Sequence, residues 1–154
     1  MTEIAAPLQP LAFLLGRWRG RGRGDYPTID SFEYEEEVTF NHVGKPFLIY
    51  QQRTWDTSGN PLHTESGYVR PVGTNGAELI IAQPTGVTEI HAGPLERRTL
   101  RLVTQSVGLS PTAKEVRAVA RTLKVVDDTL SYRLDMEAVG EGMQFHLEAE
   151  LRRE

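Results

Sequence analysis

Few side chains in this sequence could do chemistry, and the absence of cysteine narrows the choice. The 154-residue chain can form no disulfide, zinc–thiolate site, iron–sulfur cluster or cysteine nucleophile. A bound metal would take its protein ligands from the carboxylates, tyrosines and methionines, or from the four histidines, which are His42, His63, His91 and His146. No Ser/His/Asp order and no paired carboxylate cluster indicates a hydrolase.

A second pattern is the alternation of glycine and arginine from Gly16 to Gly24, around Trp18. Its spacing fits neither the dinucleotide fingerprint nor the P-loop. On a strand, the glycines and Trp18 share one face, and two interpretations stay open. Trp18 plugs one end of a core beside a tightly curved strand, or the bare backbone lets a flat ligand approach closely. The arginines would then face solvent opposite Glu33, Glu35 and Glu37.

These residues must be positioned by strands, because turn-forming residues divide most of the chain into short runs. The runs lie at roughly 16–22, 31–41, 46–54, 63–71, 77–83, 87–93, 97–106, 115–125, 129–138 and 144–153. Polar and apolar residues alternate strictly from Leu130 to Glu137 and from Phe145 to Arg152. Segment 114–126 is ambiguous between helix and strand, and its valines and flanking pattern favour a strand.

Short connections between these runs predict an all-β fold, a ten-stranded antiparallel up-and-down β-barrel. A short helical turn, within Pro7 to Leu15, precedes the first strand. No linker or composition shift divides the chain, so residues 1–154 are predicted to form a single domain. A barrel of this size has room for a small ligand inside or in its mouth.

Charge and hydropathy bear on partners and location. The 17 basic and 21 acidic residues give a net charge of −4, which argues against a nucleic-acid partner. The apolar stretch from Leu11 to Leu15 is too short for a membrane span or a signal peptide. The sequence therefore predicts a cytoplasmic protein with no membrane partner, and its exposed barrel strands permit a homodimer.

Several ordered segments carry a more specific signal. They are Gly16-x-Trp18-x-Gly20-x-Gly22, Tyr26-Pro27-Thr28-Ile29, Phe32-x-Tyr34-x-Glu36-Glu37, Gly44-Lys45-Pro46, Pro61-Leu62-His63-x-Glu65-Ser66-Gly67-Tyr68-x-Arg70, Ile81-Ala82-Gln83-x-Thr85-Gly86, Ala113-Lys114-Glu115 and His146-Leu147. Together they resemble the nitrobindin family over about residues 8 to 153.

The resemblance implies a barrel similar to those of lipocalins and fatty-acid-binding proteins, with one ferric b-type haem near its mouth. It implies His146 as the iron ligand and catalytic residue, reversible nitric oxide binding, and isomerisation of peroxynitrite to nitrate. The chain would then be a haem-dependent peroxynitrite isomerase. The alternative is a non-enzymatic carrier of a fatty acid or another small hydrophobic ligand, with a closed apolar cavity and a basic residue inside it.

The same resemblance implies roles for further residues. Cofactor-binding or pocket-lining positions are His63 on the distal side, Leu62, Gln83, Met136 and Thr28, with Lys114 and Arg121 as candidates for pairing with the haem propionates. His42 and His91 look like loop or surface residues. His146 falls on the polar parity of its strand, so a bulge within residues 143–146 is predicted to turn it inward.

Overall fold

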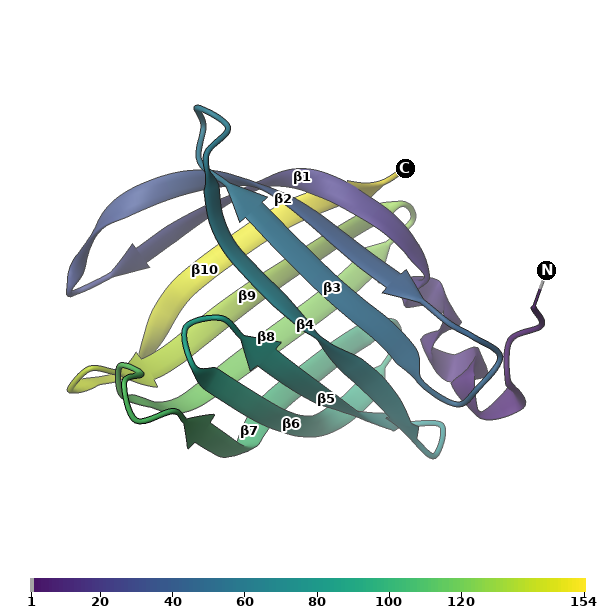
Figure 1. Ribbon diagram of the computed structural model, residues 1–154. Coiled ribbons are helices and arrows are strands. Elements are labelled where there is room, and N and C mark those ends of the chain that lie inside the picture. Colours follow the sequence, from purple (N-terminus) through teal and green to yellow (C-terminus); the bar gives the residue numbers. More distant parts are fainter. Residues whose placement is uncertain (1) are drawn as a thin grey trace.

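Ten antiparallel strands close into a barrel in the computed structural model, which describes residues 2–154 (Figure 1). A 3₁₀ helix, η1 (Ala6–Leu14), precedes the strands. The strands are β1 (Gly16–Tyr26), β2 (Ile29–Asn41), β3 (Leu48–Trp55), β4 (Pro61–Val72), β5 (Gly76–Gln83), β6 (Val87–Glu96), β7 (Thr99–Leu109), β8 (Val116–Val126), β9 (Thr129–Ala138) and β10 (Glu141–Arg153). Each strand pairs with its sequence neighbours, and β1 closes the ring on β10, so the predicted up-and-down barrel is confirmed.

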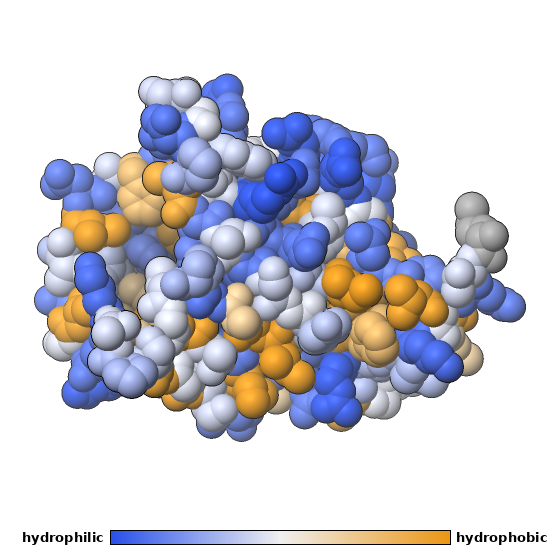
Figure 2. Space-filling model, in the orientation of Figure 1, coloured by the Kyte–Doolittle hydropathy of each residue, from blue (hydrophilic) through white to orange (hydrophobic). Residues whose placement is uncertain are grey.

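The alternating residues of the strands point to the two sides of the barrel wall. On β9, Leu130 and Leu134 are buried inside, whereas Arg133 is exposed. Segment 114–126, which was ambiguous by propensity, forms β8, since its ladders with β7 and β9 complete the ring. Apolar residues on the outer face visible in Figure 2 form separate groups among polar ones.

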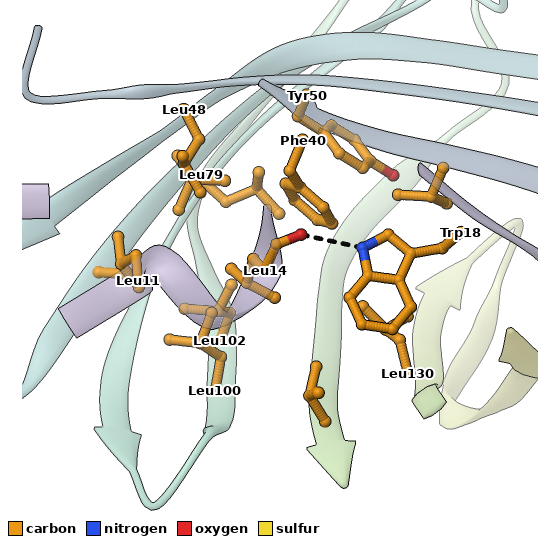
Figure 3. Packing of buried hydrophobic residues seen from close by; sticks show 14 of the residues in the cluster. Leu11, Leu14, Trp18, Phe40, Leu48, Tyr50, Leu79, Leu100, Leu102 and Leu130 are labelled. Carbon is orange, nitrogen blue, oxygen red and sulfur yellow. Dashed lines mark hydrogen bonds between the residues drawn. The ribbon is translucent and has the colours of Figure 1, made fainter. Parts of the chain in front are cut away.

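One end of the barrel is closed by η1 and Trp18. Leu11 and Leu14 of η1 are fully buried in the main apolar cluster. The Trp18 indole Nε1–H donates to the Leu14 carbonyl oxygen at 2.9 Å, and this bond anchors η1 across the end (Figure 3). The Arg153 guanidinium lies over the indole, 4.1 Å from the ring centroid. The interpretation of Trp18 as a plug is therefore confirmed.

The opposite end is formed by the β1–β2 and β9–β10 hairpins and the β7–β8 connection, at the left in Figure 1. Within residues 2–154, no helix is both long enough and apolar enough to cross a membrane.

Two glycines of β1, Gly22 and Gly24, are covered by aromatic side chains. A Cβ atom at Gly22 would collide with the Tyr34 ring, and one at Gly24 would collide with the Phe32 ring. The idea that a flat ligand lies against these glycines is therefore not supported, because two aromatic rings already lie there. On the outer face, Arg21 approaches Glu35 at 3.6 Å, as expected for the solvated arginine face.

Candidate functional site

The barrel encloses a cavity of about 600 Å³ that runs along its interior. Its wall includes Thr28 and His146 at the open end and Leu14 and Leu130 beside η1. Such a volume lies within the usual range for small-molecule sites.

His146 lies at a β-bulge. Phe145 pairs with Asp135 and Leu147 pairs with Leu134, so His146 has no partner on β9. The predicted irregularity within residues 143–146 is confirmed, and it explains how a residue on the polar parity reaches the cavity wall. The bulge also corrects the expectation that Phe145 faces the core with Leu147. The Phe145 ring instead lies beneath the Arg23 guanidinium, 4.6 Å from its centroid, outside the cavity wall.

The His146 ring is held in one orientation. Its Nδ1 lies 3.2 Å from the Asp25 carbonyl oxygen, and the Tyr26 ring packs against it edge-on at 5.3 Å between centroids. Burial lowers the pKa of His146, with a smaller contribution from His63, so the ring is neutral near pH 7. A neutral ring that donates Nδ1–H to a carbonyl keeps its lone pair on Nε2, which is the arrangement a metal-ligating histidine adopts.

Tyr26 is a site residue that sequence reasoning missed. Its hydroxyl donates to the Met136 carbonyl oxygen at 2.9 Å and accepts the Ala138 N–H at 3.0 Å. Both partners lie on β9, opposite a second register shift of β10 between Glu141 and Gln144, next to the bulge at His146. Tyr26 thus satisfies backbone groups near the bulge while its ring supports His146. The sequence did contain one indication of this role: Tyr26 lies on the same face of the strand as Gly22 and Gly24.

Most of the remaining predicted site residues lie together around the open half of the cavity. The cavity wall includes Thr28, His63, Gln83, Lys114 and Met136. Leu62 does not line it: this side chain is 49% exposed, because neighbouring residues of β4 alternate and His63 takes the inward position. The expectation that Leu62 lines the pocket is therefore corrected.

Arg121 is not free to pair with a propionate. It is buried deep in the barrel, where Nη1 donates to Glu65 Oε1 at 2.6 Å and Nη2 donates to Glu89 Oε1 at 2.9 Å. Arg121 holds the pKa values of both carboxyls below their usual range despite their burial. His91 is also corrected: it is fully buried, with Nε2 2.7 Å from Glu89 Oε1, and is not a surface residue.

We call the group of Arg121, Glu65, Glu89, His91 and Tyr50 the arginine network. Tyr50 OH donates to Glu65 Oε1 at 2.7 Å. Gln83 Nε2 donates to Glu89 Oε2, and His63 Nε2 lies 3.4 Å from Glu65 Oε2, so the network reaches residues predicted at the mouth.

A second buried group, the phenol network, consists of Tyr34, Glu36, Gln52 and Tyr132. Tyr132 OH donates to Glu36 Oε1 at 2.7 Å, and Gln52 Nε2 donates to Glu36 Oε2 at 2.8 Å. The hydroxyls of Tyr34 and Tyr132 are 2.6 Å apart. Burial raises the pKa of Glu36 to about 7, against the opposing effect of its hydrogen bonds. Sequence reasoning missed this network, although Glu36 shares the inward parity of Phe32 and Tyr34.

Within residues 2–154, no group of three or more His, Asp or Glu side chains is arranged to hold a bare metal ion. His146 lines the same cavity as Met136 and Leu147 and is a candidate ligand for an iron that a cofactor would bring with it.

Comparison with known proteins places this geometry in context. The model of the THAP4-like, heme-binding beta-barrel domain matches residues 7–153. The chain is 51% identical over 157 residues to peroxynitrite isomerase 2 of Mycobacterium ulcerans, covering 99% of this chain and 98% of that protein. It is 49% identical over 163 residues to peroxynitrite isomerase 1 of Mycobacterium tuberculosis, covering 100% and 99%. The crystal structure of Rv2717c from M. tuberculosis superposes with a TM-score of 0.93 at 48% identity, covering 99% of each chain.

Proposed function

This chain belongs to the THAP4-like heme-binding β-barrel family, and from that premise we propose that it is a haem-dependent peroxynitrite isomerase. The cofactor is a ferric b-type haem held at the open end of the barrel, and the product is nitrate. Relatives that carry this name match the chain over nearly its whole length.

The observation that carries the proposal is the bulge at His146. It exposes to the cavity one neutral imidazole whose Nδ1 faces the Asp25 carbonyl oxygen. Nε2 of His146 would hold the iron, and the hydrogen bond to Asp25 would fix the tautomer and raise the basicity of the ligand. The surrounding wall of Met136 and Leu147 suits the faces of a porphyrin, and Lys114 would pair with a propionate.

When bound, ferric haem supplies a Lewis-acidic, redox-active iron at which the O–O bond of peroxynitrite can be rearranged to give nitrate. The chain would contribute the Nε2 nitrogen of His146 to hold the iron, a fixed orientation of that ring and a wall that limits access of water. Strand β5 lies half-way round the ring from β10, so Gln83 faces the side of the cavity opposite His146. His63, on the neighbouring strand β4, also lines the cavity and would contact a ligand on that side. Nitric oxide would bind reversibly at the same iron.

The alternative function, a fatty-acid carrier, has less support. A carrier needs an internal cation free to meet a carboxylate, but Arg121 already has two carboxylate partners in Glu65 and Glu89. An incoming carboxylate would also approach Glu36 across a low-dielectric cavity, which is unfavourable. Arg121 is therefore not available to a fatty-acid carboxylate, and Lys114, which also lines the cavity, is assigned to a haem propionate.

The test is reconstitution of the purified chain with haemin. We expect a Soret band and haem-dependent decay of peroxynitrite to nitrate, followed by stopped-flow absorbance and by the nitrate-to-nitrite ratio. His146→Ala should lower haem affinity and isomerisation by at least about tenfold, because it removes the nitrogen that would hold the iron.

The matched control is His42→Ala, since His42 lies in the loop after β2 and its Nδ1 accepts the Gly44 N–H at 3.1 Å. This variant should keep both the Soret band and the rate. Equal losses in the two variants, or an unchanged Soret band in His146→Ala, would contradict the assignment of His146.

A further inference from the structure

The barrel contains two phenol–carboxylate pairs with the same contact distance. Tyr132 OH lies 2.7 Å from Glu36, and Tyr50 OH lies 2.7 Å from Glu65. The Tyr50–Glu65 pair is buried, whereas Tyr132 is half-buried beside the buried Glu36. All four residues line the cavity that also contains His146. Neither pair has a role in the proposed isomerisation.

We propose that Tyr132 is a one-electron donor that reduces nitrogen dioxide radicals inside the barrel, with Glu36 as the acceptor of its proton. The proposal rests on the proposed function, because nitrogen dioxide is released when the O–O bond of peroxynitrite breaks homolytically. A radical that leaves the reaction site without forming nitrate would otherwise diffuse out or attack the protein.

The step balances in atoms and charge. The Tyr132 O–H bond breaks, the electron reduces nitrogen dioxide to nitrite, and the proton passes to the Glu36 carboxylate along the existing hydrogen bond. The products are a neutral phenoxyl radical, nitrite and a protonated Glu36. A second nitrogen dioxide then forms a C–N bond at a ring carbon ortho to the oxygen. The displaced ring hydrogen returns to the oxygen, which leaves 3-nitrotyrosine at position 132.

The surroundings of the carboxylate distinguish Tyr132 from Tyr50. Oxidation makes a phenol strongly acidic, so the electron leaves easily only if a nearby base takes the proton at the same time. Glu36 is within hydrogen-bond reach, and its other oxygen is held by neutral Gln52. Among residues 2–154, Glu36 makes no ion pair. Glu65 receives two hydrogen bonds from Arg121, at 2.6 and 3.3 Å. Protonating Glu65 would dissolve a buried ion pair, which is unfavourable.

The protonation state of Tyr132 before oxidation also favours a coupled loss of electron and proton. Burial, with the nearby charge of Glu36, raises the pKa of Tyr132 well above its usual value. Tyr132 therefore does not lose its proton before it is oxidised. The Tyr34 hydroxyl lies 2.6 Å from that of Tyr132. A hydrogen bond donated by Tyr34 would steady the phenoxyl oxygen.

Tyr132 is also placed between the open end and the closed end of the cavity. It lies four residues before Met136 on β9, which corresponds to about 13 Å along the strand. A radical that moves inward from the region of His146 and Met136 therefore meets the phenol network before the apolar plug at Trp18.

The experiment exposes the haem-loaded chain to nitrogen dioxide generated by pulse radiolysis and, separately, to peroxynitrite. Freeze-quench electron paramagnetic resonance detects the phenoxyl radical, and peptide mass spectrometry maps 3-nitrotyrosine. We expect position 132 to be nitrated more than Tyr68, which is 48% exposed and has no carboxylate partner. Glu36→Gln should lower nitration at position 132 by at least about tenfold, because it removes the proton acceptor with little change in shape.

Two further variants keep the inference open to refutation. Tyr132→Phe should abolish most of the phenoxyl signal, whereas Tyr50→Phe should leave nitration at position 132 unchanged. Nitration that follows exposure, with Tyr68 highest, or equal nitration in Glu36→Gln and the unaltered chain, would overturn the inference. Radiolytic nitrogen dioxide reaches the protein whether or not peroxynitrite is isomerised. Loss of the Tyr132 reaction therefore overturns this inference alone, and a missing Soret band overturns the proposed function.

Discussion

The arginine network and the phenol network are two answers to one problem, a glutamate buried in a barrel. In the arginine network, Glu65 and Glu89 share the cation of Arg121 and stay ionised. In the phenol network, Glu36 accepts hydrogen bonds from the neutral groups of Tyr132 and Gln52, and its pKa rises to about 7. The residue type is the same, so the partner determines whether the carboxyl is charged.

This difference in charge state suits the two networks to different roles. Charged glutamates that are fully paired fix a conformation and exchange no proton near neutral pH. A carboxyl that titrates near 7 can accept or release a proton at little cost. The arginine network therefore serves as a structural tie across strands β4, β6 and β8, while the phenol network is the part suited to chemistry.

The largest expected effect comes from removing the cation. Arg121→Met should lower the free energy of unfolding at pH 7 by about 3–5 kcal/mol, because Glu65 and Glu89 would be left buried without a countercharge. Urea denaturation followed by circular dichroism measures the loss. The matched control is Arg117→Met on the same strand, whose exposed guanidinium lies 3.4 Å from Glu115. It should change stability by less than about 1 kcal/mol. Similar losses in both variants would mean that the arginine network is not a structural tie.

The next largest effect is on the pH dependence of stability, which differs in sign between the two networks. Because folding raises the pKa of Glu36 from 4.5 to about 7, the folded chain binds more protons than the unfolded chain in this range. This contribution therefore stabilises the fold below pH 4.5 and is lost as pH rises through 7, a change of about 2–3 kcal/mol between pH 5 and pH 8. The lowered pKa values of Glu65 and Glu89 act oppositely: their contribution is present above pH 4.5 and disappears in acid.

Urea titrations of the unaltered chain and of Glu36→Gln at pH 5 and pH 8 test this assignment. The titratable groups that face Glu36 are Tyr132 from β9, Glu65 from β4, Arg121 from β8, and the phenols of Tyr34 and Tyr50. Burial raises the pKa values of the three phenols, Arg121 lowers that of Glu65, and the two carboxylates raise that of Arg121, so none of these groups titrates near 7. The variant should therefore lose about 2–3 kcal/mol less than the unaltered chain over this interval. An identical pH dependence in both proteins would assign the titration to another group.

Much of the fold was predictable because its signals are local. Strict alternation from Leu130 to Glu137 and short turns indicated the strands, and the ten predicted runs coincide with the ten observed strands. The conflict between the parity of His146 and its expected inward direction even predicted the bulge. The compensating outward turn of Phe145 follows from the same bulge but was not anticipated.

The networks were not predictable because they depend on which strands face each other across the barrel. Arg121 and Glu65 are 56 residues apart, and Tyr132 and Glu36 are 96 apart. Alternation shows that a glutamate points inward but not what it meets there. For this reason Arg121 was interpreted as a propionate partner and His91 as a surface residue, whereas both are buried beside Glu89.

The smallest expected effect on stability comes from a substitution on β1 that displaces a side chain of the phenol network. A Cβ atom at Gly22 would collide with the far end of the Tyr34 ring, so Gly22→Ala must displace that ring. Overpacking of this kind should lower the free energy of unfolding by about 1–2 kcal/mol. Gly142→Ala is the matched control, because a Cβ atom there meets nothing within 4 Å.

The displacement should also be visible in Tyr132 and not in Tyr50. Tyr34 approaches Tyr132 at 2.6 Å but forms no hydrogen bond with the arginine network among those of the described residues. In Gly22→Ala, nuclear magnetic resonance of the ring protons should therefore show shifted Tyr132 signals and unchanged Tyr50 signals. Equal shifts at both rings would mean that the two networks are mechanically coupled, and the contrast between a rigid tie and a reactive group would fail. Unequal shifts would show that β1 tunes the reactive half of the barrel alone, which gives the glycine spacing of that strand a functional reason.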